Sequence, residues 1–155
     1  MRLALFQPDI PQNLGASLRL CACLAIWLDV IEPCAFPLSD KSLKRAALDY
    51  GNKTQTRLHS SWDEFLKAPE RQQGRLILFT TKAADPYHSF IFQPEDTLLF
   101  GRESAGAPSE VHDAAQARLY IPLAPGMRSL NVVTAAAMAL GQALICAGGF
   151  SGAPA

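Results

Sequence analysis

Residues 121–140 read IPLAPGMRSLNVVTAAAMAL, and they contain a complete strand-to-helix transition of the kind from which α/β folds are built. The stretch begins like the end of a buried strand and turns through Pro125 and Gly126. It then exposes the polar side chains of Arg128, Ser129 and Asn131 before small apolar residues follow. The expected structure is a strand, a loop that holds a ligand, and a helix stripped of bulk.

Two readings of this helix are open. Ser129 and Asn131 are typical helix caps, Arg128 is compatible with an exposed charge, and alanine is the best helix former. Close packing against another element or another chain is the alternative. We favour it because five small residues occur within seven positions: Ala135, Ala136, Ala137, Ala139 and Gly141.

Outside this stretch, strand-like and helix-like segments alternate along the chain. Apolar runs predict strands at Arg2–Phe6, 28–31, 54–58, 75–80, Thr97–Phe100 and 118–121. Helical spacing and capping residues predict helices from Asn13, over 39–50 with Ser39 or Asp40 as N-cap, over 61–67, after Pro108, and over 130–147. This alternation predicts an open, mostly parallel sheet with helices on both faces.

Composition predicts one globular domain. The chain has 155 residues, of which 49% are hydrophobic and 18% charged. Lys+Arg and Asp+Glu both number 14, so a polyanionic partner must be held by a local basic patch. No stretch reads as a signal peptide or membrane span, which predicts a cytoplasmic protein without membrane contact.

The cysteine and histidine positions predict no metal site. The four cysteines, at 21, 23, 34 and 146, form no C-x-x-C pair, and we expect reduced, mostly buried thiols. His59, His88 and His112 show no metal-ligand spacing.

Ligands of open parallel sheets bind outside the carboxyl ends of the strands, which here means the loops 7–13, 80–88, 101–107 and 122–131. In the first loop Asn13 precedes Arg19 by six residues. This spacing puts the two about 120° apart around a helix, so Arg19 is expected to flank the same cleft as Asn13. The alternative is an N-cap asparagine with a solvated arginine.

The third loop is FGRESAGAP, residues 100–108, where two glycines bracket Arg102, Glu103 and Ser104. Glycine permits tight turns and a close backbone approach to a ligand. A P-loop is absent, and so is G-x-S-x-G, because Arg102 occupies the position two before Ser104. An ordinary turn and a hydrolase nucleophile at Ser104 are the competing interpretations.

Taken together, NLGASLR at 13–19, GRESAGAP at 101–108 and IPLAPGMRSLNV at 121–132 resemble the three motifs of SpoU/TrmH-class SPOUT RNA methyltransferases. The resemblance covers nearly the whole chain. DKSLKRAALDY at 40–50 and the short length resemble the branch that methylates the ribose 2′-hydroxyl of the tRNA wobble nucleotide, a cytidine or uridine.

The resemblance implies a single SPOUT domain over residues 1–155, without a separate RNA-binding domain and with a deep trefoil knot within about residues 75–150. It implies a homodimer that binds S-adenosylmethionine and tRNA, with the active site near the interface and S-adenosylhomocysteine as product. The family's cofactor positions fall on Phe79, Thr80, Gly101, Ile121, Ser129 and Leu130.

The family's catalytic arginine falls on Arg19, and its other motif residues fall on Asn13, Glu103, Ser129 and Asn131. Because a guanidinium stays protonated in proteins, we expect Arg19 to clamp the adjacent phosphate and stabilise the developing alkoxide. Lys41, Lys44 and Arg45 lie on one helical face and, with Arg128, are expected to contact RNA. Arg2, Lys82 and Arg102 extend this expected patch; a merely solvated face is the alternative.

The chain departs from close relatives at Ala105, where they often carry a basic residue, and at Ala25 and Ala35, where they carry glycine. The first departure bears on RNA contact rather than on cofactor binding. Methylation of another tRNA position or of ribosomal RNA is one alternative function. A non-catalytic RNA-binding homodimer is another.

Overall fold

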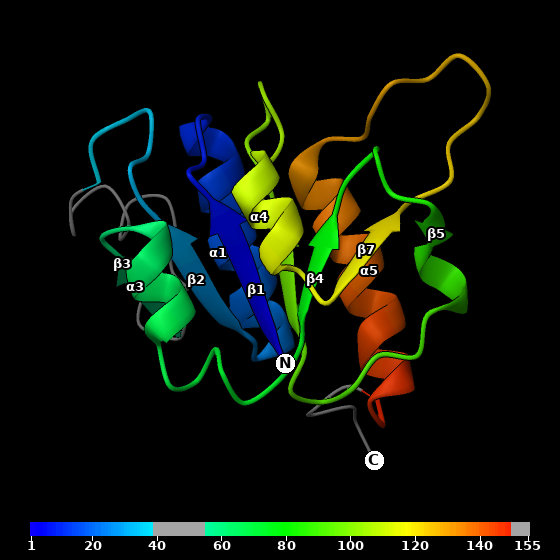
Figure 1. Cartoon of the computed structure of the whole chain (residues 1–155), viewed down its shortest axis with the longest axis horizontal. Helices are drawn as coiled ribbons and strands as arrows, with labels where there is room; N and C mark the ends of the chain where they lie inside the picture. Colours follow the sequence, from blue (N-terminus) through cyan, green and yellow to red (C-terminus); the bar gives the residue numbers. More distant parts are fainter. Residues whose placement is uncertain (39–54, 150–155) are drawn as a thin grey trace.

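The computed structural model describes residues 1–38 and 55–149, and its core is a parallel sheet in the order β3-β2-β1-β6-β4-β7-β5 (Figure 1). All six strand pairings are parallel, as predicted. The strands are β1 (Arg2–Phe6), β2 (Trp27–Ile31), β3 (Thr56–His59), β4 (Leu76–Phe79), β5 (Asp85–Pro86), β6 (Thr97–Phe100) and β7 (Ala117–Tyr120).

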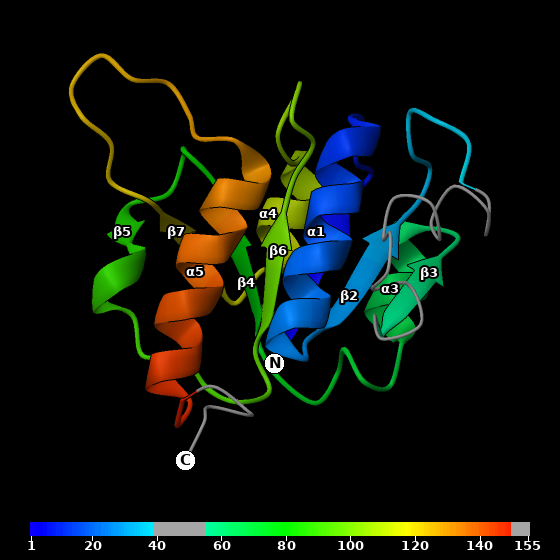
Figure 2. The ribbon, with the colours of Figure 1, turned by 180° about the vertical axis from the view of Figure 1, so that it is seen from behind.

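Helices cover both faces of the sheet, which confirms the predicted three-layer arrangement. Helices α3 (Trp62–Lys67) and α4 (Ser109–Ala114) lie on the face seen in Figure 1, and α1 (Pro11–Leu24) and α5 (Val132–Cys146) lie on the face seen in Figure 2. One apolar core joins the sheet to α1 and α5, and a second joins it to α3 and α4. The central strand β6 and its neighbour β4 are buried at every residue, because helices cover both of their faces.

The helix ends explain two sequence features. Helix α1 begins at Pro11 after the extended Ile10, so Asn13 lies inside the first turn, and the N-cap interpretation of Asn13 is wrong. At its other end Ala25 adopts φ 53° and ψ 40°, a left-handed conformation that favours glycine. In α3, Ser61 accepts a hydrogen bond from the Glu64 N–H at 3.2 Å, as the predicted cap requires.

The small residues of α5 do permit close packing. Ala136, Ala139 and Ala143 are fully buried in the core shared with α1 and the sheet. Ala137 is exposed and Gly141 is half-buried, so part of the small-residue stripe faces away from the rest of the chain.

Three expectations fail within the described residues. The loop 80–88 contains β5, a two-residue edge strand paired with β7. This strand was not predicted because it is short and contains a proline, a residue that edge strands nevertheless tolerate. The thiols are free, but only Cys21 is buried, because Cys23 and Cys146 lie on exposed positions at helix ends.

Among the described helices, none has the length and apolar character needed to cross a membrane. The predicted helix 39–50 lies outside the described residues.

Arg2 is the third failed expectation, because it belongs to a buried ionic cluster rather than to a surface patch. Its guanidinium donates to both carboxylate oxygens of Asp29, at 2.6 and 2.8 Å. His59 Nε2 lies 2.7 Å from Asp29 Oδ1. Asp29 is 1% exposed, and the cluster ties strands β1, β2 and β3 together beneath α3.

Candidate active site

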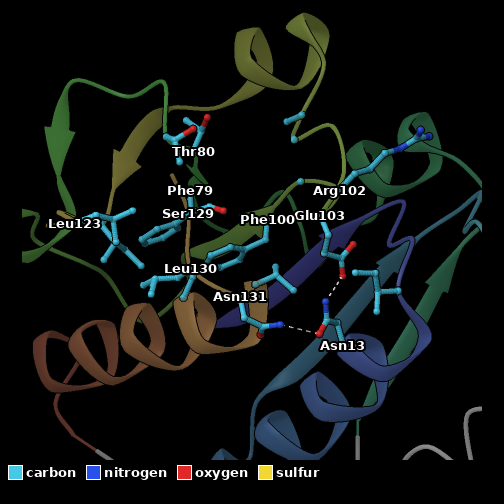
Figure 3. A pocket seen from close by; sticks show the side chains of 18 residues that line it. Asn13, Phe79, Thr80, Phe100, Arg102, Glu103, Leu123, Ser129, Leu130 and Asn131 are labelled. Atoms are coloured by element: carbon cyan, nitrogen blue, oxygen red, sulfur yellow. Dashed lines mark hydrogen bonds between the residues drawn. The ribbon is translucent and has the colours of Figure 1, made fainter. Parts of the chain in front are cut away.

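A cavity of about 450 Å³ opens at the carboxyl ends of β4, β6 and β7, beside the start of α5 (Figure 3). The segments that follow those strands supply most of its lining, as expected for an open parallel sheet. All six predicted cofactor positions contribute: Phe79, Thr80, Gly101, Ile121, Ser129 and Leu130. Asn13, Glu103 and Asn131 line it as well.

Aromatic rings form one wall of the cavity. Phe79 and Phe100 stack with their ring centroids 4.9 Å apart and their planes 11° apart. Phe92 continues the stack behind Phe79 at 6.5 Å, with an interplanar angle of 4°. Since these rings are buried in the α1/α5 core, the wall they present is flat, apolar and rigid.

Three side chains from distant parts of the sequence form a polar chain along the cavity. Asn13 Nδ2 donates to Glu103 Oε1 at 2.9 Å, and Asn131 Nδ2 donates to Asn13 Oδ1 at 3.0 Å (Figure 3). Asn131 Oδ1 also caps α5 by accepting from the N–H groups of Val133 and Thr134. Asn131 is therefore both a helix cap and a member of the site.

Glu103 sits at the tip of a tight hairpin. Arg102 and Gly106 exchange backbone hydrogen bonds of 3.0 and 2.8 Å, and Gly106 has a φ of 69°. A Cβ on Gly101 would lie 2.5 Å from the carbonyl carbon of Gly106, so glycine is required there. The Arg102 guanidinium donates to the side-chain oxygen of Gln7, and Figure 3 shows Arg102 extending outward from the hairpin.

Two carboxyl groups share this end of the site with unequal proton affinities. The side-chain hydrogen bond with Glu103 lowers the pKa of Asp9 to about 2, helped by hydrogen bonds from Ser104 and backbone N–H groups. Burial raises the pKa of Glu103, and Asp9 raises it further. Glu103 therefore takes up a proton at a higher pH than Asp9 does.

Some predicted site residues lie apart from the cavity. Arg19 is exposed on α1 and does not contribute to the lining, and Arg128 is exposed in the 121–131 segment. Lys41, Lys44 and Arg45 lie outside the described residues. Within the described residues, 1–38 and 55–149, no group of three or more His, Cys, Asp or Glu residues is placed to hold a metal ion.

Sequence reasoning missed Asp9 and Gln7. Both belong to the loop 7–13 that was singled out, but nothing in the motif pattern assigns them a partner. Ser104, the candidate hydrolase nucleophile, donates its hydroxyl to Asp9, and no histidine is among the residues that line the cavity. A serine–histidine triad is therefore not formed there.

The comparisons with known proteins agree with this geometry. Among curated proteins, a tRNA (cytidine(34)-2′-O)-methyltransferase from Beijerinckia indica subsp. indica is 54% identical over 142 residues, covering 92% of this chain and 89% of that protein. A chain from a structural study of the 2-OH methylation of C/U34 on tRNA has a TM-score of 0.84 and 39% identity, with 92% of both chains covered.

A SpoU methyltransferase from Streptomyces viridochromogenes, solved in complex with AdoMet, shares the fold with a TM-score of 0.81 at 24% identity. That match covers 92% of this chain and 58% of the other. Residues 1–141 match the profile of the SpoU rRNA Methylase family. With its three motifs gathered around one cavity, this chain belongs to the SpoU rRNA methylase family.

Proposed function

We propose that this chain transfers the methyl group of S-adenosylmethionine to the ribose 2′-hydroxyl of tRNA nucleotide 34, a cytidine or a modified uridine, in the cytoplasm. The observation that carries the proposal is the Asn13–Glu103–Asn131 chain, which joins all three family motifs at the rim of one cavity. The names of the similar proteins from Beijerinckia indica and from the C/U34 study support the choice of nucleotide.

The cavity suits S-adenosylmethionine in size and chemistry. Its volume of about 450 Å³ lies within the range of about 300–1,000 Å³ typical of small-molecule sites. The Phe79–Phe100 wall suits a planar purine, and the carboxylate of Glu103 in the lining complements a positive sulfonium. When bound, the cofactor supplies an electrophilic methyl group. The residues that would hold it are Phe79, Thr80, Gly101, Ile121, Ser129 and Leu130.

Glu103 is the group that receives the proton of the 2′-hydroxyl. Each of its oxygens accepts one hydrogen bond, from Asn13 at Oε1 and from the Asp9 N–H at Oε2, which leaves a lone pair on each for the substrate. The raised pKa of Glu103 makes its carboxylate a stronger base than an exposed glutamate.

Arg19 supplies positive charge for the alkoxide and its neighbouring phosphate. Because Arg19 is exposed on α1 and outside the cavity lining, it acts on a substrate that covers α1 or at the cavity of a second copy. The guanidinium does not need to lose a proton for this role. If Arg19→Lys lost only a little activity, a bidentate hydrogen bond between Arg19 and the phosphate would be contradicted.

A homodimer through the outer face of α1 and α5 would bring two such sites together. Met138 and Ile145, one heptad apart on α5, are both exposed apolar residues; the small residue Gly141 lies between them and Ala137 directly precedes Met138. We expect Met138→Glu combined with Ile145→Glu to convert a dimer to a monomer in sedimentation equilibrium. An unchanged mass would place any interface elsewhere.

We also propose the deep trefoil knot within about residues 75–150 and a single SPOUT domain over residues 1–155. In the sheet, β6 and β7 lie on either side of β4. Helix α5, which follows β7 in the sequence, packs against α1, which follows β1. Such crossing of sequence-distant segments supports a threaded C-terminal part. An experimentally traced backbone that can be pulled straight from both ends would refute it.

The deciding experiment measures methyl transfer from labelled S-adenosylmethionine into unmodified tRNA and maps the product nucleoside. We expect a 2′-O-methyl at nucleotide 34 with the wild type and none with Arg19→Ala. Gly101→Ala should abolish binding of S-adenosylhomocysteine, because its Cβ would collide with the Gly106 backbone. Label in ribosomal RNA, or at another tRNA position, would overturn the choice of substrate.

A further inference from the structure

Asp9, in the segment between β1 and α1, contacts the hairpin that carries Glu103, 94 positions away in the sequence. Asp9 Oδ1 accepts the Glu103 N–H at 3.2 Å, and Oδ2 accepts the Ser104 N–H at 3.2 Å. The Ser104 hydroxyl donates to Oδ2 as well. A single carboxylate thus binds three donors at the tip of the hairpin.

The contact is reciprocal. The N–H of Asp9 donates to Glu103 Oε2 at 3.1 Å, while Asn13 Nδ2 donates to Glu103 Oε1 at 2.9 Å. Both oxygens of Glu103 therefore have a donor of their own, and these two donors fix the plane of the carboxylate. The backbone of Glu103 is bound by the side chain of Asp9, and the side chain of Glu103 is bound by the backbone of Asp9.

We propose that Asp9 is a positioning residue, which holds the Glu103 carboxylate in the orientation needed for proton transfer at the cavity. Asp9 does not line the cavity, so it acts through Glu103 rather than on the substrate. The catalytic part of this inference rests on the proposed function. The positional part, the clamp between loop 7–13 and the hairpin, stands on the hydrogen bonds alone.

Charge supports the same assignment. The carboxyl of Asp9 remains ionised because of its donors, and its proximity raises the pKa of Glu103. Charged or titratable neighbours of Glu103 among the described residues include Arg102, next to it in the hairpin, and Cys34, whose own pKa is raised to about 11 by burial, Glu32 and Glu103. Removing the charge of Asp9 should therefore make Glu103 more acidic.

The test compares Asp9→Ala and Asp9→Asn with Asp113→Asn, a matched loss of charge at an exposed residue of α4. In Asp9→Ala, we expect amide hydrogen exchange of Glu103 and Ser104 to accelerate at least tenfold. We expect kcat to fall by about 10- to 100-fold, the loss typical of a misplaced reacting group. KM for tRNA and the Kd of S-adenosylhomocysteine should stay within about threefold, because Asp9 lies outside the cavity lining.

Asp9→Asn keeps the shape and part of the hydrogen bonding, so it should fold even if Asp9→Ala does not. We expect it to lower the pKa of Glu103, measured by carbon-13 NMR, and to shift the acidic limb of the kcat profile to lower pH by a similar amount. Asp113→Asn should change neither quantity. A merely structural role for Asp9 would leave that limb where it is.

Unchanged exchange at Glu103 and Ser104 in Asp9→Ala, or an unchanged Glu103 titration in Asp9→Asn, would overturn the proposal. So would a loss of kcat matched by an equal loss of cofactor affinity. Failure of the proposed function has a different signature: the wild type would methylate no tRNA, while the exchange and titration measurements would still report on the clamp.

Discussion

Asn131 donates a 3.0 Å hydrogen bond to Asn13 across 118 positions of the sequence. Because Asn131 also caps α5, this bond fixes the start of α5 against the first turn of α1. Asn13 donates an amide N–H to Glu103 Oε1. The orientation of the Asn13 amide is therefore determined, with its oxygen toward Asn131 and its nitrogen toward Glu103.

Replacing Asn131 by aspartate separates the two roles of this side chain. An aspartate can still cap α5, but it has no N–H to donate and would face the Asn13 oxygen. We expect Asn131→Asp to lower the free energy of unfolding by about 1–3 kcal/mol, because the buried Asn13 oxygen loses its donor, and to lower kcat at least about tenfold. Asn131→Ala, which also removes the cap, should cost about 1 kcal/mol in addition. Equal activity of Asn131→Asp and the wild type would show that the Asn13 bond has no catalytic role.

Among the described residues, Arg102 is the one cationic side chain that lines the cavity, and its contact with Gln7 leaves most of its N–H donors available. We expect it to bind an RNA phosphate near the reacting ribose. Arg102→Gln should weaken tRNA binding and make the slope of log K against log[salt] shallower by about 0.7–0.9. Arg118→Gln, at an exposed arginine of β7 outside the cavity, is the control. Identical salt slopes for the two variants would exclude this contact.

The Arg2–Asp29–His59 cluster makes stability depend on pH. Burial acts to raise the pKa of Asp29, but hydrogen bonds from His59 and Arg2 outweigh it and hold the pKa below its usual value. The carboxylate therefore stabilises the fold above the unfolded pKa of about 3.9, and this contribution is lost as pH falls through the lower folded-state pKa. We expect Asp29→Asn to cost about 3–5 kcal/mol near neutral pH, because Arg2 loses a buried partner.

Urea unfolding at fixed protein concentration measures this cost at several pH values. The difference between wild type and Asp29→Asn should shrink as the pH falls through the acidic range in which Asp29 takes up its proton. A difference that is constant with pH would mean that the charge of Asp29 is not what stabilises the cluster.

The two long helices provide a matched pair for testing backbone strain. Ala25 ends α1 in the left-handed conformation, whereas Ala147 ends α5 at φ −86°. A left-handed alanine costs about 1–2 kcal/mol, so Ala25→Gly should raise the free energy of unfolding by about 1 kcal/mol after the entropy of glycine is subtracted. Ala147→Gly should lower it, because there glycine brings only the entropic cost. Thermal unfolding should show shifts of opposite sign, about 2–4 °C for 1 kcal/mol.

Much of the fold followed from local sequence. The apolar runs at 75–80 and Thr97–Phe100 predicted β4 and β6 to within a residue, because a strand buried on both faces must be continuously apolar. The Ser61 cap and the glycines after α5 marked helix ends correctly. β5 escaped prediction because two residues, one of them proline, carry no periodicity.

The candidate site was predictable as a set of loops but not as a set of contacts. Family resemblance identified Glu103 and Asn13, yet the bond between them spans 90 positions, and no local pattern encodes it. Asp9 went unnoticed for the same reason, since an aspartate after a strand is ordinary in a loop. Periodicity placed Arg19 on a face of α1, but the position of that face relative to the cavity depends on tertiary packing. The knot and the dimer stay predictions.

The hydrogen bonds among Asp9, Asn13, Glu103 and Asn131 also limit how such enzymes can be recombined. A chimaera that received only the 101–107 hairpin of a relative would pair a foreign tip with the resident loop 7–13, and one mismatched carboxylate would leave three donors unsatisfied. Exchange of these loops should succeed when they move as one block, together with the start of α5. The unit that can be exchanged between relatives is then larger than a single loop.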